Sequence, residues 1–142
     1  RPLVLVVISA IAIYFAVYQF AFPRLETIWI SNRVVAMLNA HRQGSDCAAP
    51  SVITIGYNET SLAFLGPLDL RFATPESAMD LLTQAPCRLL VMASKEEPAV
   101  QMIAAARGLQ LAPLKALSGI TLNGGDAITL TLFRLKTVKS AP

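Results

Sequence analysis

The run from Leu3 to Phe22, LVLVVISAIAIYFAVYQFAF, contains 20 residues and no charged side chain. An α-helix rises about 1.5 Å per residue, so a helix of about 20 apolar residues spans the roughly 30 Å hydrocarbon core of a bilayer. A signal peptide is the alternative, but it has a shorter apolar stretch and ends at small residues. Aromatic residues crowd the end of this run in QFAFPR. The sequence therefore predicts a transmembrane helix over residues 1–23.

The aromatic residues of this run gather toward its C-terminal end, at Tyr14, Tyr18, Phe20 and Phe22. Aromatic rings favour the boundary between hydrocarbon and water, so this end is expected to lie at a membrane surface. The lipid bilayer is thus the first predicted partner. Because the chain begins with Arg1 and not with Met, we expect it to be part of a longer protein.

The segment of residues 24–50 is predicted to form an amphipathic helix followed by a linker. Its apolar residues fall at helical spacing, at Leu25, Ile28, Val35 and Leu38, with Trp29, Val34 and Met37 widening the stripe. We expect Trp29 to pack on the domain rather than to rest among lipid headgroups. The turn-forming sequence QGSDCAAP then ends the helix and leads into the next segment.

Residues 51–138 alternate between strand and helix patterns and are predicted to form an α/β domain. Strands are expected over residues 51–57, 68–73 and 87–94, with helices over 59–65 and from Thr74. Thr74 is placed as the N-cap of its helix, before Pro75. A further helix is expected to begin with a capping box at Ser94 and Glu97 and to end at Gly108.

The last part of the domain has a different pattern, in which two β-rich segments flank NGGD, residues 123–126. Asn-Gly-Gly favours a tight hairpin turn. In the final strand, Ile128, Leu130 and Leu132 alternate with Thr129, Thr131 and Phe133. The predicted fold class is α/β: a transmembrane helix, then a small three-layer domain whose mixed sheet has a parallel core and a C-terminal antiparallel hairpin.

Composition and residue spacing exclude several classes of function. The net charge of +3 is dispersed, and no basic cluster alternates with aromatics, so nucleic acid is not a predicted partner. One histidine and two cysteines without CxxC or HxxxH spacing predict no metal site. His41 is assigned to a helix C-terminus, where a cation is favourable, and no GxSxG surrounds Ser61 or Ser94. We predict no catalytic residue in this chain and no cofactor.

Cys47 and Cys87 are a candidate disulfide. Cys47 precedes the first predicted strand and Cys87 begins the third, and in doubly wound sheets these strands are often neighbours. Both thiols would then lie at the same edge of the sheet, within the roughly 7 Å between Cα atoms that a bridge requires. In an oxidising compartment the bridge would close a loop of about 40 residues and stabilise the domain by roughly 3–4 kcal/mol. The alternative is two unpaired cysteines, with Cys87 buried.

A polar group follows the first predicted strand: Tyr57, Asn58, Glu59 and Ser61. The carboxyl ends of parallel strands are where ligands bind in open α/β sheets, so these residues are candidate contacts to a ligand or acceptor. The structural alternative is that Asn58 caps the next helix, that Glu59 is a favourable acid in its first turn and that Ser61 also caps backbone N–H groups. We favour the structural role.

The segment GYNETSLAFLG, residues 56–66, resembles a Gly-Tyr-x-Glu-x-Ser-Leu-x-Phe-Leu segment of some bacterial membrane glycosyltransferases. These are the ArnT-like and protein-mannosyltransferase-like enzymes of GT-C architecture. The matching positions are Gly56, Tyr57, Glu59, Ser61, Leu62, Phe64 and Leu65. The order of parts is also similar, because a last transmembrane helix precedes a compact α/β domain.

This resemblance implies a function. Such enzymes transfer a hexose or pentose from a polyprenyl-phosphate donor to a lipid, glycan or protein acceptor, outside the cytoplasm. Their catalytic acids lie in an early extracytoplasmic loop, so the chain is expected to be an accessory, periplasmic C-terminal domain in the bacterial inner membrane, with the rest of the enzyme as its partner. The alternative is a single-pass, membrane-tethered binding or scaffolding module without catalysis. A third hypothesis is a small hydrolase that uses Glu59 or Ser61.

Overall fold

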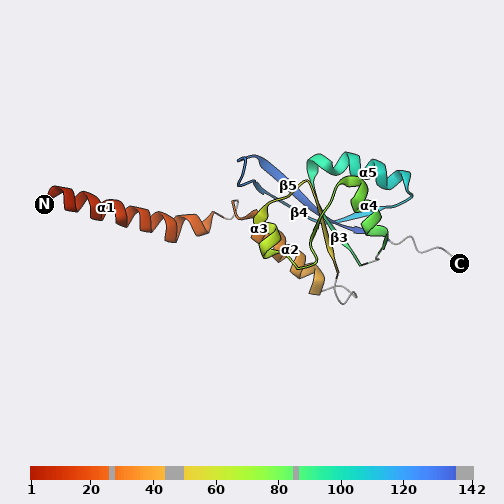
Figure 1. The fold of residues 1–142 in the computed structure, drawn as a ribbon, viewed down its shortest axis with the longest axis horizontal. Helices are drawn as coiled ribbons and strands as arrows, with labels where there is room; N and C mark the ends of the chain where they lie inside the picture. Colours follow the sequence, from red (N-terminus) through yellow and green to blue (C-terminus); the bar gives the residue numbers. More distant parts are fainter. Residues whose placement is uncertain (26–27, 44–49, 85–86, 137–142) are drawn as a thin grey trace.

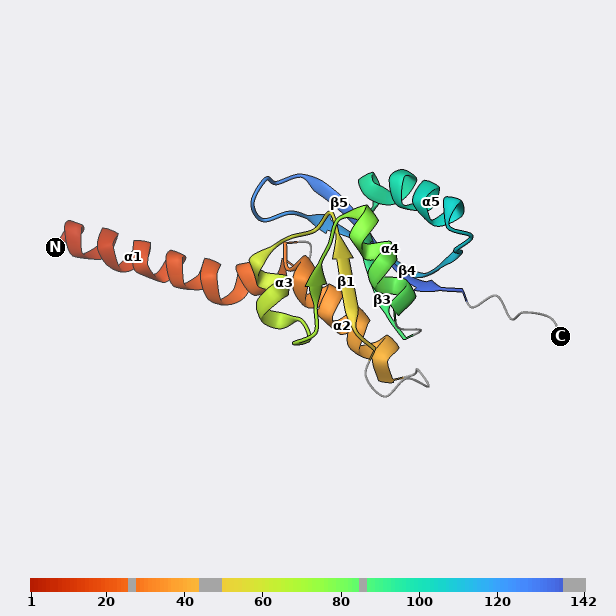
Figure 2. The same cartoon turned by 45° about the vertical axis from the view of Figure 1, so that its right-hand side comes forward.

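The computed structural model consists of one long apolar helix joined to an α/β body (Figure 1). It describes residues 1–25, 28–43, 50–84 and 87–136. The body contains a five-stranded mixed sheet with helices on both faces, as Figures 1 and 2 show. The predicted α/β class, with a parallel core and an antiparallel hairpin, is confirmed.

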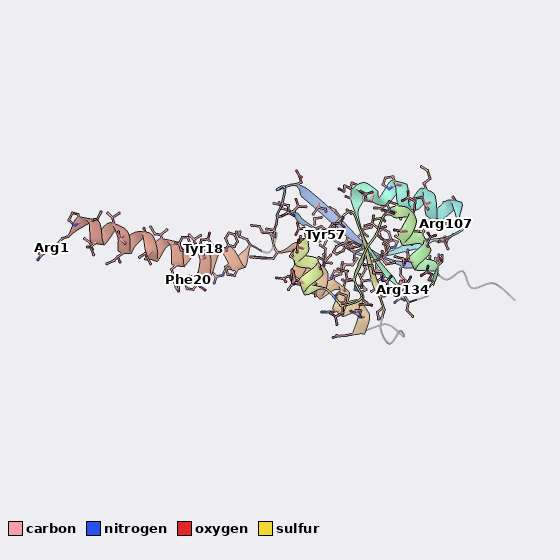
Figure 3. All side chains as sticks on the ribbon, viewed as in Figure 1. Arg1, Tyr18, Phe20, Tyr57, Arg107 and Arg134 are labelled. Carbon is pink, nitrogen blue, oxygen red and sulfur yellow. The ribbon has the colours of Figure 1, made fainter. Side chains whose placement is uncertain are left out.

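The apolar helix begins as α1 (Pro2–Ala16), continues through a π-helical turn, η1 (Val17–Ala21), and ends in a 3₁₀ turn, η2 (Phe22–Arg24). None of its residues is buried against the body. Over Pro2–Arg24 it is long and apolar enough to cross a membrane. Arg1 lies at its far end, whereas Tyr18 and Phe20 lie near the body (Figure 3). Its apolar surface thus has no protein to cover it among the described residues.

Helix α2 (Ile30–Gln43) starts later than predicted, because the chain does not continue as a helix from Arg24. Leu25 has φ −80° and ψ 67°, outside the helical region, and this ends the helix from the span. The Trp29 indole N–H then donates a hydrogen bond of 3.1 Å to the Phe22 carbonyl oxygen. Trp29 is 37% exposed, its ring meets Phe22 edge-on and it lines a hollow with Leu65 and Leu122, so it lies on the surface of the body and not in its core.

The C-terminal half of the predicted apolar stripe is present on α2. Val34, Met37 and Leu38 are buried, together with Ile30, whereas Leu25 is exposed and lies outside the helix. These side chains join the same core as the sheet. The core of the body therefore includes α2, from Ile30 onward.

The strands are β1 (Val52–Ile55), β2 (Arg71–Phe72), β3 (Leu89–Ala93), β4 (Leu111–Ile120) and β5 (Ala127–Leu135), in the sheet order β2-β1-β3-β5-β4. Strand β1 pairs in parallel with both β2 and β3, and β5 lies antiparallel between β3 and β4. Strand β2 is shorter than the predicted residues 68–73, because the Leu70 N–H bonds to the Pro67 carbonyl and forms a turn there.

Two apolar layers enclose the sheet, and the alternation of side chains along the strands assigns each residue to one of them. Leu89, Val91 and Ala93 of β3 face α2 and α3 (Thr60–Leu65), whereas Leu90 and Met92 face the opposite helices. Those opposite helices are α4 (Pro75–Gln84) and α5 (Glu97–Ala106). The alternation predicted for the last strand is also present, since Leu130 and Leu132 lie in the α2 layer and Phe133 in the other.

Two of the three predicted helix ends are confirmed. The Ser77 N–H bonds to the Thr74 hydroxyl at 3.4 Å, so Thr74 caps α4. After α5, Gly108 has φ +67°, and the Leu109 N–H returns to the Ala104 carbonyl as in a Schellman motif. Ser94 is not a cap, because residues Ser94–Glu96 form a 3₁₀ turn (η3) before α5 begins at Glu97.

Candidate functional site

The site is built on the turn that follows β1. Gly56 adopts φ +75°, and a Cβ atom there would lie 2.6 Å from Glu96 Cγ and 3.0 Å from Ala93 Cβ. Only glycine suits a positive φ with so little space. The turn therefore passes close to the end of β3 and directs the following residues toward the hairpin.

Glu59 accepts hydrogen bonds from three different segments. Its Oε2 atom accepts from the Tyr57 hydroxyl at 2.9 Å and from the Ser61 hydroxyl at 3.3 Å. Its Oε1 atom accepts from the Leu122 backbone N–H at 2.9 Å. Ser31 of α2 completes the group, because its Oγ lies 2.7 Å from the Tyr57 hydroxyl and 2.8 Å from Ser61 Oγ. We call Ser31, Tyr57, Glu59, Ser61 and the Leu122 N–H the Glu59 cluster.

The Glu59 cluster is largely closed to solvent. Tyr57, Glu59 and Ser31 are 2%, 6% and 4% exposed, respectively. A buried polar group destabilises a fold unless it is hydrogen-bonded, and each of these side chains has a partner. The cluster joins α2, the β1–α3 turn, α3 and the hairpin. Within the cluster, each of the side chains of Ser31, Tyr57, Glu59 and Ser61 has a hydrogen-bond partner in the protein, so none requires a ligand.

Burial raises the pKa of the Tyr57 hydroxyl well above its ordinary value, and the neighbouring Glu59 carboxylate adds to this increase, although the Ser31 hydroxyl opposes it. An anionic phenolate beside Glu59 would be desolvated and repelled. Tyr57 therefore remains a neutral hydrogen-bond donor at physiological pH, which is the form that the cluster uses.

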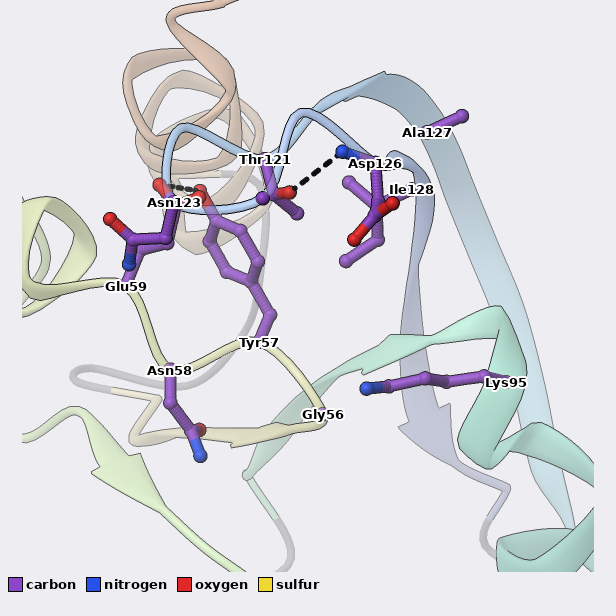
Figure 4. Close-up of a pocket in the computed structure, with 11 residues that line it drawn as sticks. Gly56, Tyr57, Asn58, Glu59, Lys95, Thr121, Asn123, Asp126, Ala127 and Ile128 are labelled. Carbon is purple, nitrogen blue, oxygen red and sulfur yellow. Dashed lines mark hydrogen bonds between the residues drawn. The ribbon is translucent and has the colours of Figure 1, made fainter.

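The structure differs from the predicted capping roles in this segment. Glu59 itself is the N-cap residue of α3, and it makes no side-chain cap hydrogen bond. Asn58 is exposed, and its side chain points away from the Tyr57 ring (Figure 4). The prediction that Asn58 caps the helix and that Glu59 is a first-turn acid was therefore wrong. Likewise, Ser61 uses its hydroxyl in the Glu59 cluster.

An open depression of about 460 Å³ lies between this turn and the hairpin. Gly56, Tyr57, Asn58 and Glu59 form one wall, and residues Thr121 to Ile128 contribute most of the other. Figure 4 shows Lys95 reaching toward it from η3. Ser61 does not line this depression, so the structure does not bring all four predicted contact residues to one opening.

Sequence reasoning missed Lys95 and the hairpin residues Asn123 and Asp126, which all line the depression. Lys95 follows β3, and β3 is parallel to β1, so the shared carboxyl edge of those strands was a usable signal. No comparable sequence signal identified Asn123 and Asp126. The hairpin lies at this edge because β5 pairs with β3, and that pairing joins segments far apart in the sequence.

The depression offers polar contacts but no recognisable catalytic arrangement among the described residues. Lys95 and Asp126 are exposed, and the Glu59 carboxylate is already bonded. His41 does not line the depression, and its Nδ1 lies 2.8 Å from the Met37 carbonyl oxygen on α2. In the described part of the chain, no group of three His, Cys, Asp or Glu side chains is placed to hold a metal ion.

Cys87 is half-buried and takes part in a disulfide bond. The segment containing Cys47 lies outside the described residues, so pairing of these two cysteines stays a prediction. That prediction depends on β1 and β3 being neighbours in the sheet. They are, and Val52 lies opposite Leu89.

No protein-family model, curated protein or solved structure matches this chain. The resemblance to membrane glycosyltransferases therefore depends on the residues of the segment 56–66 and on the order of parts alone. What the geometry adds is a physical role for several of those residues.

Proposed function

We propose that this chain is a membrane-anchored, extracytoplasmic accessory domain of a polyprenyl-phosphate-dependent glycosyltransferase, and that it supplies no catalytic group. The observation that carries the proposal is the Glu59 cluster. The segment that resembles the glycosyltransferases uses its acid as a structural acceptor for Tyr57, Ser61 and Leu122. The apolar helix over Pro2–Arg24 supports the membrane anchor.

The pattern Gly-Tyr-x-Glu-x-Ser fits a structural role position by position. Gly56 makes a turn that needs positive φ, and Tyr57 and Glu59 are buried in the cluster. Asn58 and Thr60, which are not among the matching positions, are both exposed. The roles of Gly56, Tyr57 and Glu59 are therefore explained by packing and hydrogen bonding, with no need for chemistry at Glu59, whereas the matched Phe64 and Leu65 are exposed.

Hydrolysis by Glu59 or Ser61 has little support in this geometry. A serine nucleophile needs an adjacent base that is itself oriented by a third group. Ser61 is bonded to Ser31 and Glu59, and its hydroxyl lies in a part-buried network rather than at the surface of the depression. Catalysis is therefore assigned to other parts of the proposed enzyme.

The proposal is tested on the complete gene product, purified from membranes with the reading frame upstream of Arg1 intact. We expect that frame to encode further apolar spans, with an acidic pair in the first extracytoplasmic loop. The protein should release polyprenyl phosphate from a panel of polyprenyl-phosphate-linked hexoses and pentoses, and the 142-residue chain alone should not. A start codon directly before Arg1, or an intact protein that consumes no member of the panel, would contradict the proposal.

A membrane-tethered binding module is the second candidate, and the open depression favours it. Lys95 provides a cation and Asp126 a carboxylate at the same opening, an arrangement suited to a polar, hydroxyl-rich ligand. Binding of free glycans to the 142-residue chain, lost in Lys95→Ala and Asp126→Ala and retained in Glu76→Ala, would favour this candidate if the upstream frame encodes no enzyme.

A further inference from the structure

Five apolar side chains remain exposed on the body near the span: Trp29, Phe64, Leu65, Leu68 and Leu122. Phe64 is 85% exposed, Leu65 is 49% exposed, and Leu68 is fully exposed. Helix α3 buries only Leu62, so most of its apolar surface faces outward. We call these five residues the apolar patch. Exposed apolar surface that exceeds scattered single side chains marks an interaction site.

Three residues of the patch come from three segments of the chain and line one hollow. A hollow of about 250 Å³ is lined by Trp29 from the link after the span, Leu65 from α3 and Leu122 from the hairpin turn. Phe64 adjoins Leu65 in the sequence, and Leu68 follows in the turn after α3. Asp69, which follows Leu68 in the sequence, is paired with Arg42 at 3.5 Å.

The apolar patch lies where the span meets the body. Trp29 contacts Phe22 at the end of the span through both its ring and its indole N–H. Phe22 stacks on Tyr18, and Tyr18 contacts Tyr14, so one row of aromatic rings leads from the span to the patch. Figures 1 and 2 both show the apolar helix leaving the body beside α3 and the hairpin turn.

The Glu59 cluster fixes the patch in place. It bonds Ser61 at the base of α3 and the backbone of Leu122 to the same carboxylate. Ser31, two residues after Trp29, belongs to the same network. Three segments that each carry patch residues are therefore held together by one buried hydrogen-bonded group.

We propose that the apolar patch inserts into the headgroup and upper acyl region of the bilayer that the Pro2–Arg24 helix crosses. This inference rests on the proposed membrane anchoring. A bilayer surface is the occupant because the patch continues the aromatic row of the span and because Phe64 and Leu68 protrude instead of lining a groove. The body is thereby held against the membrane, with α3 and the hairpin turn as its contact surface.

The test uses tryptophan fluorescence of the 142-residue chain in phosphatidylcholine vesicles. Trp29 is the one tryptophan, so Trp29→Phe gives a tryptophan-free background for three single reporters. Phe64→Trp reports the patch, and Phe15→Trp reports the span. Met102→Trp is the matched control, because Met102 is also an exposed apolar residue, 74% exposed, but lies on α5 in the other layer.

We expect lipids brominated near the headgroup end of the acyl chain to quench Phe64→Trp several-fold more strongly than Met102→Trp. More deeply brominated lipids should quench Phe15→Trp. Quenching of Phe15→Trp with equal, weak quenching of the other two would overturn the patch inference and leave the anchor intact. No quenching of Phe15→Trp would overturn the anchor itself. Protection of Phe64→Trp from aqueous acrylamide without lipid quenching would also overturn the inference and would indicate a protein contact.

Discussion

The Glu59 side chain connects three segments of the chain through hydrogen bonds. Its two oxygens bind groups from the β1–α3 turn, α3 and the hairpin, and its Leu122 contact spans 63 residues of sequence. A carboxylate accepts several hydrogen bonds and donates none, so it suits a position surrounded by donors. The residue that first resembled an active-site acid is thus explained by the donors around it.

Replacing Glu59 by Gln should destabilise the body by about 1–3 kcal/mol, because an amide N–H₂ would face donors and leave at least one of them unsatisfied. Glu76→Gln is the matched control: Glu76 is exposed in the first turn of α4, where the change should cost about 1 kcal/mol or less. Denaturant unfolding in mild detergent measures both. Equal unfolding midpoints for the two variants would show that the Glu59 cluster is not a structural link.

Tyr57 makes the stability of the body sensitive to alkaline pH. Because its pKa is raised in the folded state, the unfolded chain loses its phenolic proton first, near pH 10. The contribution of Tyr57 to the free energy of unfolding should therefore be constant below about pH 9 and fall as the pH rises above 10. Urea unfolding at several pH values measures this slope.

Tyr57→Phe is the control for that pH dependence, since it removes the titrating hydroxyl and keeps the ring. The variant should be less stable at neutral pH by about 1–3 kcal/mol, because Glu59 and Ser31 lose a partner. Its decline above pH 10 should be shallower than that of the original chain. A parallel decline in both proteins would assign the effect to other groups.

At the scale of elements, the local signals predicted most of what the structure contains. Hydrophobic periodicity located β1, β3, α4 and the terminal hairpin, since each depends on residues close together in sequence. The errors lie where a distant contact overrides the pattern. The link before α2 continues a helical stripe in sequence, yet Leu25 leaves helical geometry and Trp29 bonds back to Phe22. Asn58 looks like a cap, but burial of Tyr57 and Glu59 turns it outward.

Two glycines allow the strain of a turn to be separated from its packing. Gly56 and Gly108 have φ +75° and +67°, but a Cβ at Gly108 would meet nothing within 4 Å, whereas one at Gly56 would meet Glu96 and Ala93. Gly108→Ala should cost about 1–2 kcal/mol from the left-handed conformation alone. Gly56→Ala should cost about 1–3 kcal/mol more, from overpacking. Thermal unfolding of the two variants measures both costs. Equal losses of stability would mean that the turn at Gly56 accommodates a Cβ atom without overpacking.

At the scale of the whole molecule, the sequence predicted the layers but only part of the site. The neighbouring positions of β1 and β3 followed from general rules of doubly wound sheets. The depression did not, because one of its walls is the hairpin turn, whose position depends on β5 inserting between β3 and β4. Similarly, the apolar patch gathers residues from the link, α3 and the hairpin, which no local pattern relates.

The disulfide is a prediction at this scale because it connects distant segments. A peptide map of the protein under non-reducing conditions should contain one fragment that joins Cys47 to Cys87. Reduction should lower the free energy of unfolding by roughly 3–4 kcal/mol, as expected for a closed loop of about 40 residues. Alkylation of Cys47 without prior reduction would contradict the pairing.

The central proposal is that the apolar helix anchors this body at the extracytoplasmic surface of a bacterial inner membrane. Two reporters, each fused after Pro142 of the complete gene product, test it most directly. Alkaline phosphatase is active only outside the cytoplasm, whereas green fluorescent protein fluoresces only when it folds inside the cytoplasm. We predict active phosphatase, no fluorescence, and a fusion that stays in the membrane after carbonate washing. A fluorescent fusion without phosphatase activity, or a protein released by carbonate, would contradict the account.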